Sequence, residues 1–316
     1  MRGVDAIMAA RRADAFAKRS IKASSKRQAL GLAMSILDLT TLEGKDTPEK
    51  VRGLCRKAMH PLDLPAGVAA PVPPVPHVAA VCVYPTLVPV AKEALAGSAV
   101  RVAAVATGFP SAQYPLGVRL RDCADAIAAG ADEVDMVISR GLFLSGRHDE
   151  VVREIRETRA VCAAPPKGAP AHLKIILETG ELETLDNVRR ASDLAIEAAC
   201  TVPGLAPPAD GEVFIKTSTG KVQPAATMPV TLVMLEAIRD AFLASGVRIG
   251  MKPAGGIRTA KQAIAYLVMV KETLGEEWLH PHLLRFGASA LANDIARQVL
   301  RMQAGGYAAG YDVSEA

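Results

Sequence analysis

Two lysines end short apolar runs whose residues favour β-strands. Lys216 closes the run Val-Phe-Ile-Lys, and Lys252 closes the run Ile-Gly-Met-Lys. If these runs are neighbouring parallel strands, the two ammonium groups lie close together. At about 4 Å and an effective dielectric of about 20 they repel by about 4 kcal/mol, enough to bring the pKa of one lysine from about 10.4 to about 7–8. A neutral lysine amine attacks carbonyl carbons and forms a Schiff base, which serves as an electron sink for carbon–carbon bond chemistry.

Acidic residues lie in similar apolar runs. Asp135 occurs in Glu-Val-Asp-Met-Val, and by strand order it is placed to move protons together with the second lysine. A buried ion pair without chemistry is the alternative for Asp135 and one lysine, because structural pairs also perturb pKa values. Further charges stand in or near such runs at Asp38, Lys174 and Glu178. Their convergence with two lysines favours a catalytic interpretation.

Three glycine-containing segments follow the last predicted strands. They contain Gly220 and Lys221, then Gly255 and Gly256, and finally Gly287, Ala288 and Ser289. Their backbone N–H groups can together hold an anion, and barrels commonly bind phosphate near strands seven and eight. Turn formation alone is the competing interpretation, but three such loops in succession favour a phosphate site.

The elements that must position these residues repeat regularly. Eight β-rich runs alternate with helical segments, which predicts parallel strands closed into a (β/α)8 barrel. The runs are Ser35–Leu42, Val78–Tyr84, Val100–Thr107, Glu133–Ile138, His172–Glu178, Glu212–Thr217, Val247–Lys252 and Leu284–Ser289. An open doubly wound sheet is the alternative, but no Gly-x-Gly-x-x-Gly occurs. Proline-rich stretches at 61–77, 163–171 and 201–211 are predicted to be surface loops.

Composition narrows the class of protein. The 316 residues are 50% hydrophobic and 22% charged, which allows a large core, and the net charge of +4 requires no nucleic-acid partner. Five cysteines without a Cys-x-x-Cys pair favour a reducing, cytoplasmic setting. No His-Glu-x-x-His motif or membrane-spanning run occurs, so we expect a protein without metal, cofactor or membrane association.

The basic charge is concentrated at the start of the chain. Residues 1–27 contain eight Lys or Arg residues and two Asp residues. An organellar targeting peptide is one interpretation. We favour the other, an extra amphipathic helix that packs beneath the barrel or between subunits.

Several longer motifs resemble the deoxyribose-phosphate aldolase family. They are Leu-Asp-Leu-Thr-Thr-Leu at 37–42, Ala-Val-Cys-Val-Tyr-Pro at 80–85, Ala-Thr-Gly-Phe-Pro at 106–110, Asp-Glu-Val-Asp at 132–135, Glu-Thr-Gly-Glu-Leu at 178–182, Phe-Ile-Lys-Thr-Ser-Thr-Gly-Lys at 214–221 and Lys-Pro-Ala-Gly-Gly-Ile-Arg at 252–258. The similarity runs from about residue 35 to 300. The N-terminal extension and the C-terminal tail resemble the longer, eukaryotic-type branch of that family.

The resemblance implies a class I aldolase that cleaves 2-deoxy-D-ribose 5-phosphate to D-glyceraldehyde 3-phosphate and acetaldehyde. It implies that Lys216 forms the Schiff base, that Lys252 lowers its pKa, and that Lys252 and Asp135 together relay protons. The expected substrate-binding residues are Asp38, Thr40, Cys82, Lys174, Thr217, Gly220, Lys221, Gly255, Gly256, Gly287 and Ser289. The family also suggests a homodimer.

The chain departs from the family pattern in places. Ala290 replaces a second hydroxyl residue after Ser289, so we expect one phosphate hydrogen bond to be missing, and Ser139 replaces a commoner Asn. Tyr307 or Tyr311 could assist proton transfer, although a flexible tail is the favoured interpretation.

We therefore expect a helical extension at 1–34, a barrel at 35–303 and a tail at 304–316. The alternative functions are another Schiff-base barrel of transaldolase type, and a catalytically idle barrel that binds sugar phosphates.

Overall fold

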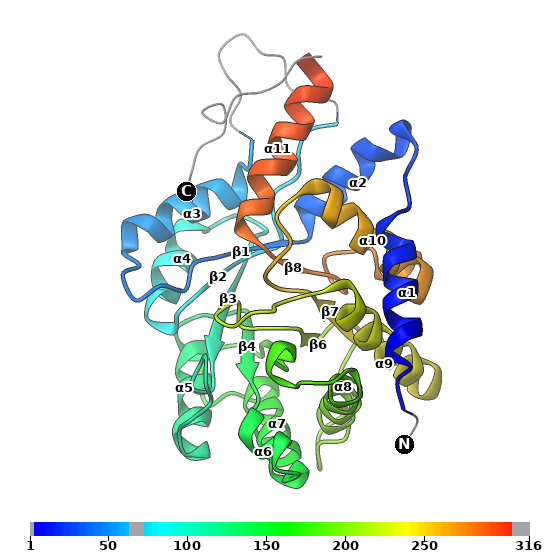
Figure 1. Ribbon diagram of the computed structural model, residues 1–316. Coiled ribbons are helices and arrows are strands. Elements are labelled where there is room, and N and C mark those ends of the chain that lie inside the picture. The colour runs from blue at the N-terminus through cyan, green and yellow to red at the C-terminus, as the bar shows by residue number, and fades with distance from the viewer. Residues whose placement is uncertain (1–2, 63–72, 305–316) are drawn as a thin grey trace.

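The computed structural model describes residues 3–62 and 73–304. Within them, eight parallel strands form one sheet in the order β7-β6-β5-β4-β3-β2-β1-β8 (Figure 1). Parallel bridges from Met251 to Leu284 and from Ala254 to Gly287 join β7 to β8 and close the barrel. The strands are β1 Leu37–Thr40, β2 Ala80–Val83, β3 Arg101–Ala106, β4 Glu133–Val137, β5 His172–Ile176, β6 Val213–Lys216, β7 Gly250–Lys252 and β8 Phe286–Gly287. The predicted (β/α)8 barrel is confirmed.

Helices connect and surround the strands. They are α1 Ala6–Ala17, α2 Ala23–Ser35, α3 Pro48–Met59, α4 Val88–Ala94, α5 Leu116–Ala128, α6 Arg140–Leu144, α7 His148–Ala163, α8 Leu185–Cys200, α9 Met228–Ser245, α10 Ala260–Leu274 and α11 Ser289–Ala304. Short 3-10 helices span Pro85–Leu87, Thr179–Glu181 and Glu276–Trp278. Each predicted strand contains an observed one that is shorter, because its end residues leave the sheet to form loops.

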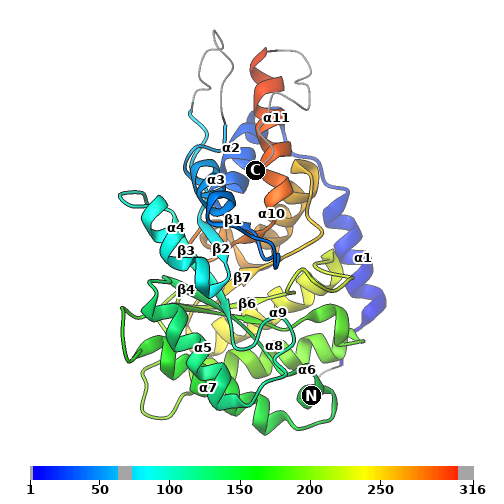
Figure 2. The ribbon, with the colours of Figure 1, turned by 90° about the vertical axis from the view of Figure 1, so that its left-hand side faces the viewer.

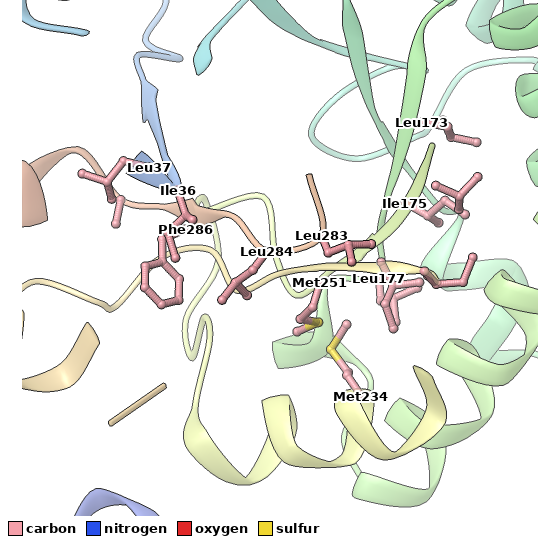
Figure 3. Close-up of a cluster of buried hydrophobic side chains, with 14 of the residues drawn as sticks. Ile36, Leu37, Leu173, Ile175, Leu177, Met234, Met251, Leu283, Leu284 and Phe286 are labelled. Atoms are coloured by element: carbon pink, nitrogen blue, oxygen red, sulfur yellow. The ribbon is translucent and has the colours of Figure 1, made fainter. Parts of the chain in front are cut away.

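Successive strand residues face opposite sides of the barrel wall. The outward residues are apolar and pack against the helices, as Met251 of β7 does near Met234 of α9 (Figure 3). The inward face is different, since it carries Asp38, Asp135 and Lys174 at 0% exposure beside small apolar side chains. The hydrophobic core therefore lies between barrel and helices, and leaves the interior for polar groups.

The basic N-terminal segment contains α1 and α2. Ala9, Ala13 and Phe16 form the buried face of α1. The helix lies beside α9 and α10 on the outside of the barrel, not beneath it (Figure 1, Figure 2). Arg12 pairs with Glu236 of α9 there. Basic residues of the N-terminal segment thus form ion pairs with neighbouring helices.

The proline-rich segments at 163–171 and 201–211 connect helix to strand, as predicted. The proline-rich segment at 61–77 lies partly outside the described residues. Tyr307, Tyr311 and the predicted tail from residue 305 onward lie wholly outside them. Within the described residues, no helix combines the length and apolar character needed to cross a membrane.

His172, at the start of β5, makes stability depend on pH. Burial lowers its pKa to about 4 from 6.5, and Arg101 Nη1 lies 3.3 Å from Nε2, a contact that requires Nε2 to be unprotonated. Because the unfolded chain binds the proton more tightly, the free energy of unfolding should fall as pH drops from about 6.5 to about 4, by about 1–2 kcal/mol for this residue.

Chemical denaturation at pH 7 and pH 5 tests this. His172→Gln should reduce the difference in unfolding free energy between the two pH values, while His60→Gln, at an exposed histidine, should leave it unchanged. An equal pH dependence in all three proteins would refute the assignment.

Candidate active site

A single carboxylate oxygen joins the two lysines that end β6 and β7. Asp135 Oδ2 lies 2.7 Å from Lys216 Nζ and 2.8 Å from Lys252 Nζ. The two lysines are register partners on adjacent strands, so the predicted juxtaposition is confirmed. Asp135 reaches them from β4, on the same inner surface of the barrel wall.

The shared carboxylate of Asp135 changes the pKa values expected for two neighbouring ammonium groups alone. Burial lowers the pKa of Lys252, but the charges of Asp135 and Asp38 outweigh it, and the net pKa lies above its ordinary value. Burial alone would raise the pKa of Asp135, yet the charges of Lys216, Lys252 and Lys174 hold it well below the usual range. Lys252 is therefore an ammonium group at neutral pH and Asp135 is a carboxylate.

A second set of charges continues the network around this cluster. Lys252 Nζ also lies 2.5 Å from Asp38 Oδ2, and Arg285 binds Asp38 and Glu133 at 2.8 Å each. Lys174 pairs with Glu133 and lies 3.3 Å from Asp135 Oδ1. Every charge is compensated by a neighbour, as buried ions require.

Lys174 and Asp38, expected to bind substrate, are fully buried within this network and do not line the pocket described below. Lys174 instead contacts Asp135, and Asp38 contacts Lys252, so these two residues position the catalytic candidates. Glu133 and Arg285 were missed in the sequence. The same signal could have found them, since each is a charged residue within an apolar strand run.

A pocket of about 330 Å³ opens above Lys216. Seven of the expected site residues line it: Thr40, Lys216, Gly220, Lys221, Gly255, Gly287 and Ser289. Glu43, Lys50 and Thr219 line it as well and were not expected. Glu43 lies in the polar loop after β1, and Lys50 lies in the first turn of α3. The sequence of this segment does not indicate which of its side chains face the pocket.

Hydrogen bonds fix the loop that follows Lys216. Thr217 Oγ1 accepts from Ala254 N at 2.9 Å, and Ser218 Oγ donates to Ala254 O at 2.5 Å, so Thr217 ties the loop after β6 to that after β7. On the other side, Glu178 accepts from Thr219 through its backbone and hydroxyl groups. Burial raises the pKa of Glu178.

The expected anion-binding N–H groups divide into two sets. Gly255 N donates to Gly287 O at 3.0 Å and Gly287 N donates to Pro253 O at 2.9 Å, so these two groups close the barrel and are not free for an anion. The expectation that these two N–H groups bind an anion is therefore wrong, while substrate contact by the two glycines, which line the pocket, stays a prediction. The N–H groups of Gly220, Gly256 and Ser289 make no backbone hydrogen bond with another described residue, and they remain available.

Two expected side chains are already engaged or unreactive. The Ser289 hydroxyl accepts from Thr40 N at 2.8 Å and donates to Thr40 O at 2.9 Å, which joins β1 to the start of α11. Cys82 Sγ lies 4.0 Å from Asp135 Oδ2. Burial, reinforced by the Asp135 charge, raises the pKa of the Cys82 thiol to about 11, so Cys82 is protonated and a poor nucleophile.

Across residues 3–62 and 73–304, no group of three His, Cys, Asp or Glu side chains is arranged to hold a metal ion. The nitrogen and oxygen atoms at the pocket floor pair with one another instead, and what they can do together is hold and transfer protons beside a lysine amine.

Known proteins resemble the chain over most of its length. It is 46% identical to deoxyribose-phosphate aldolase from Homo sapiens over 94% of this chain and 89% of that protein, and equally identical to the Mus musculus protein over the same shares. Among solved structures, QR15, an aldolase, matches with a TM-score of 0.61 at 25% identity, covering 85% of this chain and 97% of that one.

The fold alone is shared with a tetrameric deoxyribose phosphate aldolase from Aeropyrum pernix. That structure matches with a TM-score of 0.56 at 20% identity, and the match covers 90% of this chain and 100% of that chain. The model of the DeoC/LacD family aldolases matches residues 32–295, which include every strand of the barrel. With the lysine pair and its carboxylate at the centre of that match, the chain belongs to the DeoC/LacD aldolase family.

Proposed function

We propose that the protein is a class I deoxyribose-phosphate aldolase. It would cleave 2-deoxy-D-ribose 5-phosphate reversibly to D-glyceraldehyde 3-phosphate and acetaldehyde. One observation carries the proposal: Lys216 lines the pocket while its Nζ contacts a carboxylate that also contacts the ammonium group of Lys252. The activity of the human and mouse relatives supports the same assignment.

Lys216 is the nucleophile in this scheme. Its Nζ loses a proton, attacks the C1 aldehyde of the open-chain sugar, and water leaves to give a protonated imine. Removal of the C3 hydroxyl proton then breaks the C2–C3 bond, which releases glyceraldehyde 3-phosphate and leaves the electron pair in an enamine. Protonation at C2 and hydrolysis of the imine release acetaldehyde and restore the amine.

Asp135 and Lys252 serve as the proton relay. Asp135 Oδ2 contacts both nitrogens, so a proton can pass between Lys216 and Lys252 without crossing solvent. The surrounding charges of Asp38, Lys174 and Glu133 hold these groups in place.

The phosphate would lie over the loops after β6, β7 and β8. Lys221 and the N–H groups of Gly220 and of Ser289, the first residue of the 16-residue helix α11, would contact the phosphate from the pocket wall. The N–H group of Gly256, beside the pocket-lining Gly255, would add a further hydrogen bond. Thr40 and Ser289 join the wall of the site from β1 and α11.

We also propose a homodimer in the cytoplasm. Cys55, Cys82, Cys123, Cys162 and Cys200 are all free thiols, which supports a reducing compartment. Sedimentation velocity tests the dimer, and fractionation of cells that produce the tagged protein tests the location.

Reduction with borohydride in the presence of acetaldehyde should attach an ethyl group to Lys216. Lys216→Leu should abolish this label and lower kcat by a factor on the order of 10⁴ or more, whereas Lys261→Leu, at an exposed lysine of α10, should change neither. Mass spectrometry of peptides locates the label. Labelling of another lysine, or full activity in Lys216→Leu, would overturn the mechanism, and a preference for dihydroxyacetone donors would favour a transaldolase.

Ala290→Ser should restore a phosphate hydrogen bond. The Ser289 hydroxyl is occupied by Thr40, while Ala290 is exposed in the first turn of α11, so a hydroxyl there would be free to donate. We expect the KM for the phosphorylated sugar to fall about threefold to tenfold, because hydrogen bonds to charged groups are strong. The KM for unphosphorylated 2-deoxyribose is the internal control, and an equal change in both would argue against a phosphate contact.

A further inference from the structure

Two lysines that line the pocket are paired with carboxylates from the segment after β1. Lys221 Nζ lies 2.7 Å from Glu43 Oε1, and Lys50 Nζ lies 2.6 Å from Asp46 Oδ1. Glu43 and Lys221 belong to the loops after β1 and β6, strands that are not neighbours in the sheet. This Glu43–Lys221 ion pair is called the clasp below.

The two ion pairs differ in how firmly their carboxylates are held. The Asp46 side chain is 1% exposed and also accepts hydrogen bonds from Thr41 Oγ1 at 2.8 Å and Glu43 N at 2.9 Å. The Glu43 side chain is 58% exposed, and among the described residues its carboxylate has a hydrogen bond with Lys221 alone. Exposed ion pairs of this kind are weak, so Glu43 can be displaced and Asp46 cannot.

Glu43 is negatively charged when a substrate arrives. The hydrogen bond from Lys221, together with its positive charge, lowers the pKa of the Glu43 carboxyl. At neutral pH the clasp is therefore a full ion pair, and a second anion that approaches Lys221 meets a carboxylate already in place.

Both loops keep their shape without the clasp. Asp46 holds the loop after β1 through the backbone of Glu43. The loop after β6 is held by Glu178 through Thr219, whose hydroxyl in turn accepts from Lys221 N at 3.0 Å. The Glu43 side chain can therefore leave Lys221 while the backbone of both loops stays in position.

A phosphate on Lys221 needs the same ammonium group that Glu43 occupies. A phosphate dianion offers more charge and more acceptor oxygens than a carboxylate, so it can take the ammonium group, but the freed Glu43 stays close and repels it. We propose, on the basis of the proposed function, that Glu43 is a specificity-determining residue. Its carboxylate pairs with Lys221 in the free enzyme and must leave Lys221 when the substrate phosphate binds. Glu43 therefore weakens the preference for phosphorylated over unphosphorylated sugars.

Phosphate binding measured without turnover provides the test. Phosphorus NMR titration with inorganic phosphate gives the Kd for the wild type, Glu43→Gln and Glu49→Gln. Glu49 is the matched control, because it also lies near the start of α3 but pairs with Arg52, is 80% exposed, and does not line the pocket. We expect Glu43→Gln to lower the Kd about fivefold, the order of magnitude of one exposed ion pair, and Glu49→Gln to leave it unchanged.

Kinetics provide the second readout. In Glu43→Gln the ratio of KM for 2-deoxyribose to KM for 2-deoxyribose 5-phosphate should rise by a similar factor. An unchanged or weaker phosphate affinity in Glu43→Gln, or the same gain in Glu49→Gln, overturns the proposal. Absence of aldol cleavage in the wild type would instead overturn the proposed function, and the phosphate titration would still decide the role of Glu43.

Discussion

The site depends on one buried oxygen atom that two lysines share. Asp135 Oδ2 contacts Lys216 and Lys252. Without this negative charge Lys216 would lose its carboxylate partner, and two adjacent buried ammonium groups would have only Asp38, beside Lys252, to compensate them. The carboxylate also gives the two lysines different surroundings. Lys252 has Asp38 as a second partner, which favours its ammonium form, while Lys216 faces the pocket. Two residues of the same type thus occupy different environments, one that favours the ammonium group and one that opens onto the pocket.

The barrel makes this arrangement possible because it separates two kinds of core. Apolar side chains such as Leu39, Met136 and Met251 pack outward against helices, and this layer supplies the hydrophobic stabilisation. The interior is consequently free to hold ions whose burial is unfavourable unless each has a partner. Glu133 and Arg285 continue the chain of partners below Asp135, so the reactive end of the network rests on groups that take no part in the chemistry.

Much of this could be predicted from the sequence, and the reasons for success and failure are physical. Charges within apolar strand runs, which alternate faces with a period of two, identified Asp135, Lys216 and Lys252. The alternation of eight such runs with helical segments predicted the barrel. The sequence cannot show which loop N–H groups are already used, and Gly255 and Gly287 proved to be engaged with each other's strands. Nor could it orient Glu43 and Lys221, since contacts between distant loops leave no local periodicity. The expected domain boundaries and substrate contacts remain predictions.

The closing edge of the barrel joins folding to ligand binding. β8 has two residues, and its link to β7 consists of two isolated bridges, at Leu284 and Gly287. Among the described strands, this seam is the junction without a continuous run of paired residues. A phosphate held by Gly256 on one side and Ser289 on the other would span that seam. A bound substrate or product would then link the two strands noncovalently. The free energy of unfolding would therefore be higher in the presence of sugar phosphate than in its absence.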